Sequence, residues 1–129
     1  MAIIYTNYFD GILDDLIALL RTEFTTTAIM KGELNAEGNS PAIGIEPYSK
    51  TIDSEDSIGK KDFTFTTQLW LFITDANEAN AVVQMTDFAE HVEELLTDNK
   101  DYAGGTTNWR NSWIERIEYG ARASARGVL

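Results

Sequence analysis

The sequence predicts an α+β domain in which two helices pack on one face of a mainly antiparallel sheet. Two segments, residues 7–22 and 75–98, repeat apolar residues at the three- and four-residue spacing of an amphipathic helix. Other segments alternate with the period of two that is typical of strands. The chain has 129 residues, 43% of them hydrophobic, which suits a single domain with one modest core. The expected order is helix, strand, strand, long loop, strand, helix, strand.

The first helix is predicted at residues 7–22, where Asn7 is placed to cap the amino end. Asp10, Asp14 and Asp15 lie toward the positive end of the helix dipole, and Arg21 lies toward the negative end. The apolar stripe consists of Phe9, Ile12, Leu13, Leu16, Ile17 and Leu20.

Two extended segments follow this helix. Residues 24–34 carry β-branched threonines and Ile29, which favour a strand. Residues 43–52 contain Pro47, which predicts an edge strand or a bent strand. The polar and charged run at residues 49–62 predicts either a mobile acidic loop or an extended hairpin tip.

The strand at residues 63–74 has two unequal faces. One face is apolar along most of its length, whereas the other begins with threonines and Gln68 and ends with Trp70 and Phe72. Both predicted helices are needed to cover the first face. We therefore expect Trp70 and Phe72 to be covered by a neighbouring subunit. The alternative is cover from the bent strand near Pro47 or from the carboxyl-terminal tail.

The second helix is predicted to begin after Asp75, an N-cap that Glu78 complements three residues later, and to end near Asp98. Its stripe contains Val82, Met85, Phe88, Ala89, Val92, Leu95 and Leu96. After a turn, residues 109–120 alternate and predict a final strand. Residues 121–129 are small and basic and predict an extended tail.

Charge is unevenly distributed along the chain. The net charge is -11, yet residues 110–129 hold four arginines against two glutamates, which leaves -13 on the remainder. An acidic body argues against a general nucleic-acid binder. The arginines either form ordinary salt bridges or make a basic strip that meets an acidic surface on a neighbouring subunit.

The sequence contains no signature of catalysis or of metal binding. The chain lacks cysteine, and dinucleotide, P-loop, zinc-protease and nucleophile-elbow motifs are all missing. The single histidine, His91, has only Asp87 and Glu94 at helical spacing, which is a thin ligand set. We expect no catalytic, cofactor-binding or metal-binding residues and no enzyme activity. The amino terminus does not resemble a signal peptide, and no apolar run approaches ~20 residues, so no membrane partner is expected.

The order of elements resembles a known family of virion proteins. Three segments carry the resemblance, and they read KDFTFTTQLWLFITD, NEANAVVQMTDFAEHVEELL and WIERIEYG. This arrangement resembles the tail terminators of long-tailed bacteriophages and the related tail-completion (neck) proteins. The likeness is one of element pattern across nearly the whole chain.

The resemblance implies a structural protein of the virion, assembled in the host cytoplasm. It implies a ring, most often a hexamer, that caps the tail tube and joins it to the head–tail connector, with DNA passing through the bore. An acidic lumen suits that passage because it does not retain phosphate. No cofactor is implied.

Two groups of residues are the candidate contacts of such a ring. The subunit interface is predicted to contain Trp70, Phe72, Arg110, Arg116, Arg122 and Arg126. The loop that faces the lumen or a partner is predicted to contain Asp53, Glu55, Asp56, Lys60 and Lys61. The alternative function is a small soluble α+β ligand-binding or enzyme domain, with a pocket between the sheet and the turn at residues 98–108.

Overall fold

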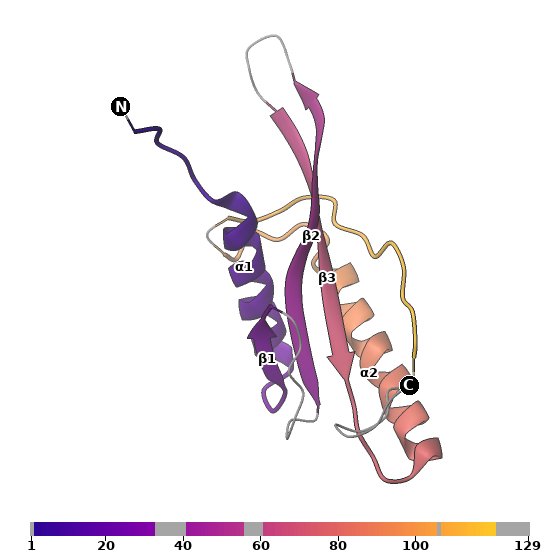
Figure 1. The fold of residues 1–129 in the computed structure, drawn as a ribbon. Helices are drawn as coiled ribbons and strands as arrows, with labels where there is room; N and C mark the ends of the chain where they lie inside the picture. Colours follow the sequence, from indigo (N-terminus) through magenta and orange to yellow (C-terminus); the bar gives the residue numbers. More distant parts are fainter. Residues whose placement is uncertain (1, 33–40, 56–60, 106, 121–129) are drawn as a thin grey trace.

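The computed structural model describes residues 2–32, 41–55, 61–105 and 107–120, and within the strands the side chains of residues 53–55 and 61–62 are left aside. It confirms the α+β class, with two helices and a three-stranded sheet (Figure 1). The elements are α1 (Tyr8–Glu23), β1 (Ala28–Lys31), β2 (Ala42–Glu55), β3 (Lys61–Phe72) and α2 (Glu78–Asp98).

The sheet has the order β1-β2-β3, and its two pairings differ in direction. The short β1 lies parallel to the start of β2, so that Ile29 is opposite Ile43. The long β2–β3 ladder is antiparallel and runs from the Ala42–Phe72 pair to the Glu55–Lys61 pair. The sheet is therefore mixed, with the antiparallel ladder as its longer part.

The core lies between one face of this sheet and both helices, as predicted. Ile43 and Ile45 of β2 are fully buried and pack with Leu16 and Leu20 of α1. The α2 helix joins the same cluster through Phe88, whose ring makes an edge-to-face contact with the ring of Phe24. The partly buried apolar residues around the cluster include Leu69 and Leu71 of β3 and Ile73 just after it. Because one cluster holds both helices, both cover the same face of the sheet.

The helix ends are fixed by side chains that accept backbone N–H groups. Asn7 caps α1, as predicted, by accepting the N–H of Asp10. The prediction that Asp75 caps α2 is wrong, because Asn77 is the cap and accepts the N–H of Asn80. Asp75 instead accepts the N–H of Asn77 at 2.8 Å and so forms the turn that precedes the helix. Within the described parts of the chain, no helix has both the length and the hydropathy to cross a bilayer.

The β2–β3 ladder continues beyond the helices as a two-stranded arm (Figure 1). We call residues 48–55 and 61–66 the hairpin arm. Of the two alternatives for residues 49–62, the structure shows the hairpin, because β2 extends to Glu55 and pairs with β3 from Lys61 onward. The arm is held at its base by Lys50, whose Nζ lies 4.3 Å from the Phe63 ring centroid, and by an edge-to-face contact between Phe65 and Phe9.

The predicted final strand is absent. Trp109 makes a single antiparallel bridge to Tyr102, and residues 110–120 form no helix or strand. Every residue of that segment is exposed. Its alternation therefore has no partner among the described strands. The predicted tail at residues 121–129 lies outside the described residues.

Candidate assembly surface

The face of the sheet opposite the helices carries the largest aromatic side chain of β3. Side chains alternate along strands, so Gly44 and Glu46 point away from the helices when Ile43 and Ile45 point toward them. Gly44 is paired with Trp70, and Ala42 with Phe72. We call this surface the open face, and its described residues from the three strands are Ala28, Met30, Ala42, Gly44, Glu46, Gln68, Trp70 and Phe72.

Trp70 is held in place on the open face while its ring stays accessible. Its side chain is 39% exposed, and its Nε1 donates a hydrogen bond to Oε1 of Glu46 at 2.8 Å. That bond satisfies the one polar group of the indole. The surface that remains accessible on Trp70 is therefore mostly apolar, which suits an interface core.

Phe72 shares the face with Trp70 but is partly buried. The other predicted interface residues lie elsewhere in the chain. Arg110 and Arg116 are exposed in the segment without secondary structure, where Arg116 lies 3.5 Å from Glu118. Arg122 and Arg126 fall outside the described residues. The structure thus places Trp70 and Phe72 on the same face. Among the described residues, neither of them contacts Arg110 or Arg116.

The residues that were predicted to face the lumen or a partner also fall partly inside and partly outside the described chain. Asp53 and Glu55 belong to β2 and Lys61 belongs to β3, so they lie on the hairpin arm and not in a loop. Asp56 and Lys60 lie outside the described residues. The arm adds exposed apolar side chains of its own, at Tyr48 and Ile52.

A second apolar surface, at the amino end, was missed by the sequence interpretation. Residues 2–7 precede α1 without forming a helix or strand and extend away from the body (Figure 1). Ile4 is 99% exposed, and Ile3 and Tyr5 are nearly as accessible. The signal was available, because an Ile-Ile-Tyr run placed before the helix cap has no helical stripe to join. Monomeric proteins rarely leave consecutive large apolar residues in water.

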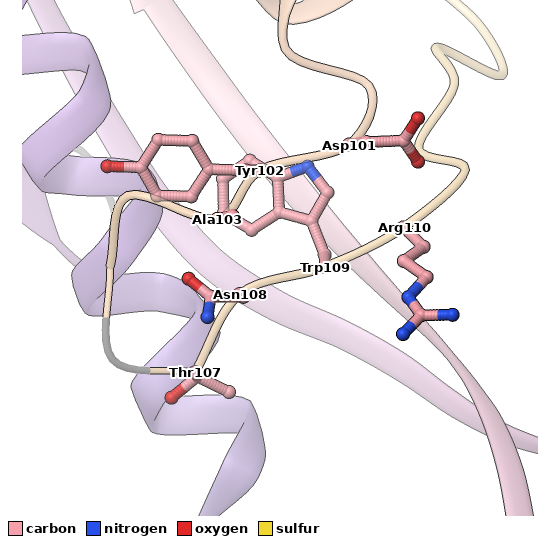
Figure 2. Close-up of a pocket in the computed structure, with 7 residues that line it drawn as sticks. All are labelled: Asp101, Tyr102, Ala103, Thr107, Asn108, Trp109 and Arg110. Atoms are coloured by element: carbon pink, nitrogen blue, oxygen red, sulfur yellow. The ribbon is translucent and has the colours of Figure 1, made fainter.

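A depression lies beside the turn at residues 99–112, close to where the alternative function requires a pocket (Figure 2). Its volume is about 620 Å³, and its lining is formed by Asp101, Tyr102, Ala103, Thr107, Asn108, Trp109 and Arg110. The rings of Tyr102 and Trp109 stack with centroids 4.6 Å apart. Asp101 and Arg110 point away from the stacked rings, and Asp101 accepts the N–H of Asn111. The lining therefore places no pair of free acid and base groups together for catalysis.

The buried carboxylate of Asp15 anchors this turn to α1. Asp15 is 5% exposed and accepts the N–H groups of Thr107 at 2.7 Å and Asn108 at 2.9 Å. Trp109 adds a hydrogen bond from its indole to the carbonyl of Asn99. Asp15 is thus a structural acceptor for the two backbone N–H groups of the turn. Its position on an amphipathic helix did not reveal this role.

Replacing Gly105 with alanine is expected to destabilise the protein. A Cβ atom at this position would overlap the Asp15 carboxyl group, which cannot move without losing its bonds to the turn. We expect a loss of about 1–3 kcal/mol in the free energy of unfolding, measured by urea denaturation. Gly104→Ala is the matched control, since a Cβ there would meet only the side chain of the partly buried Tyr102, at 3.1 Å or more. Equal losses in both variants would contradict this role for Gly105.

The remaining charged contacts are structural. Lys31 joins β1 to α1, since its Nζ lies 2.6 Å from Oδ1 of Asp14 and 2.9 Å from Oδ1 of Asp10. The hydrogen bonds that Lys31 donates to Asp14 and Asp10 raise its pKa. Nε2 of His91 in α2 lies 2.8 Å from Oε1 of Glu23 in α1, so this contact links the two helices. Among the described residues, no group of three His, Cys, Asp or Glu side chains converges as a metal site would require.

Comparison with models of known protein families, with curated proteins and with solved structures gives no match to this chain. Function is therefore inferred from the chain's own residues.

Proposed function

We propose that this protein is a structural subunit that assembles with copies of itself into a ring, in the manner of a phage tail terminator. The observation that carries the proposal is the open face, where Trp70 keeps an accessible apolar ring although its N–H is already bonded. No helix of the described chain covers this face, because α1 and α2 both pack on the other one. A second copy is the simplest cover for it.

Exposed apolar side chains before α1 and after the turn that follows α2 favour the same role. Ile3 and Ile4 precede α1 and are largely accessible, and Trp113 is 68% exposed. Large aromatic and aliphatic side chains are typical of interface cores. Segments that extend from a subunit can reach neighbours on either side, which suits a closed ring.

The distribution of charge fits a head-to-tail arrangement. A ring requires two unlike surfaces, one on each side of the subunit. The acidic body and the arginine-bearing segment after residue 109 are such a pair. In the proposed role the ring, most often a hexamer, caps the tail tube, contacts the head–tail connector and lets DNA pass through an acidic bore.

The second candidate function is ligand binding by a small α+β domain. A depression of about 300 Å³ lies between the sheet and the turn, lined by Tyr8, Ile12, Phe63, Phe65, Thr107 and Asn108. Its position agrees with the one that this function predicts. Its polar lining amounts to a phenol, a hydroxyl and an amide, which offers little to orient a substrate. Binding of small molecules by a protein that stays monomeric would favour this second function.

Shortening the hairpin arm is expected to leave the fold intact and to impair assembly. Ile52 and Phe63 are cross-strand partners, so residues 53–62 can be replaced by an Asn-Gly turn that joins them directly. The core lies at the other end of the ladder, and we expect the melting temperature to change little. The shortened protein should fail to cap tail tubes, as checked by electron microscopy of tubes mixed with each variant. Unimpaired capping would show that the arm has no role in joining.

A further inference from the structure

Residues 113–119 have the sequence of a strand but no strand to pair with. One alternation phase contains Trp113, Glu115, Ile117 and Tyr119, and the other contains Ile114, Arg116 and Glu118. In the structure the whole segment is exposed and belongs to no ladder. A half-apolar alternating segment gains stability only when it joins a sheet.

The sheet offers an edge that is long enough for this segment. On the side away from β2, β3 pairs with no strand of the described chain, and it is twelve residues long. The other open edge is the part of β2 beyond Ile45, where β1 stops. That part of β2 contains Pro47 and two register shifts, features that discourage further pairing. The β3 edge contains no proline, and in both shifts the extra residue belongs to β2.

Charge complementarity points to the same edge. The α2 helix packs against β3 and carries six carboxylates and neither lysine nor arginine. The segment that follows residue 109 carries Arg110 and Arg116. A strand added at the β3 edge would bring these arginines beside the acidic helix.

We propose that residues 113–119 of one copy add as a strand to the β3 edge of the next copy. The inference rests on the proposed ring, for which it supplies the contact. Trp113, Ile117 and Tyr119 then lie on the open face beside Trp70 and Phe72, and the sheet grows from three strands to four. Each subunit gives one segment and accepts one, which is the head-to-tail contact that closes a ring.

Disulfide trapping tests the pairing directly, because the chain has no cysteine of its own. Glu115→Cys, Arg116→Cys, Ile117→Cys and Glu118→Cys are each mixed with a differently tagged Gln68→Cys protein under mild oxidation. Gln68 is on the open face, so heterodimers should form with positions 115 and 117 and not with 116 and 118. Moving the acceptor to Thr67→Cys should reverse the pattern. Equal linking at all four positions would contradict strand addition.

Proline substitution supplies a second readout. The segment is unpaired in the single chain, so a proline there should not change the melting temperature of the monomer. Two adjacent variants, Arg116→Pro and Ile117→Pro, are compared with Arg116→Ala and Ile117→Ala, because only alternate N–H groups of an added strand face its partner. One of the two prolines should weaken assembly about tenfold more than its alanine counterpart, as one lost backbone hydrogen bond predicts.

The outcomes separate this inference from the proposed function. The wild type could form rings while disulfide trapping shows no alternation and neither proline weakens assembly. That result would overturn strand addition but would not contradict the proposed ring. A wild type that never associates would overturn both. A Gln68→Cys/Ile117→Cys double variant that links only within one chain would show that the segment folds back on its own β3, and would also overturn the inference.

Discussion

Replacing Trp70 with serine is expected to weaken self-association by roughly 30-fold or more, while the monomer remains folded. The indole is the largest accessible apolar group on the open face, and truncating such an aromatic anchor typically costs about 2 kcal/mol or more of binding. Its loss from the edge strand should cost the monomer no more than about 1 kcal/mol. Sedimentation velocity measures the first effect and thermal melting measures the second.

Two variants control for this result. Trp70→Phe keeps most of the apolar surface and removes only the hydrogen bond to Glu46, so it should retain most of the association. Val83→Ser removes an apolar side chain that is 66% exposed on α2, away from the open face, and should have little effect. A Trp70→Ser protein that assembles normally and melts early would assign Trp70 to folding and not to assembly.

Replacing Asp15 with alanine is expected to produce the largest loss of monomer stability. Two backbone N–H groups of the turn would lose their shared acceptor, the buried carboxylate of Asp15, in a partly buried site. Each unsatisfied buried donor costs about 1–3 kcal/mol, so we expect a loss of about 2–4 kcal/mol in the free energy of unfolding. Urea denaturation, monitored by tryptophan fluorescence, measures this loss. Trp109 is a suitable probe because it lies directly after the residues that Asp15 anchors.

The neighbouring Asp14 is the matched control. Its carboxylate is exposed and bonds only to the exposed Lys31 among the described contacts, so Asp14→Ala should cost less than about 1 kcal/mol. A smaller loss at Asp15 than at Asp14 would show that the turn does not depend on the buried carboxylate.

The helices and the core could be predicted from the sequence because their signals are local. The stripe that includes Leu16 and Leu20 becomes the core face of α1, and Asn7 caps that helix as predicted. The α2 cap was placed at Asp75 because both Asp75 and Asn77 can accept backbone N–H groups. A local pattern does not decide between two such residues in the same turn.

The other differences have a nonlocal cause. Alternation at residues 113–119 indicates a strand but carries no information on whether the partner lies in the same chain. The parallel pairing of β1 depends on where the chain returns to the sheet. The role of Asp15 depends on a turn more than ninety residues away along the chain. The position of Trp70 on the face opposite both helices could be predicted, because it follows from the alternation itself.

Native mass spectrometry combined with negative-stain imaging tests self-assembly most directly. The purified full chain is measured over a range of concentrations, alone and with preformed tail tubes, and the Trp70→Ser variant is measured alongside it. We predict a single closed ring, of six subunits in the most common form, that the variant fails to make. A wild type that stays monomeric at every concentration, with and without tubes, would contradict the proposed function.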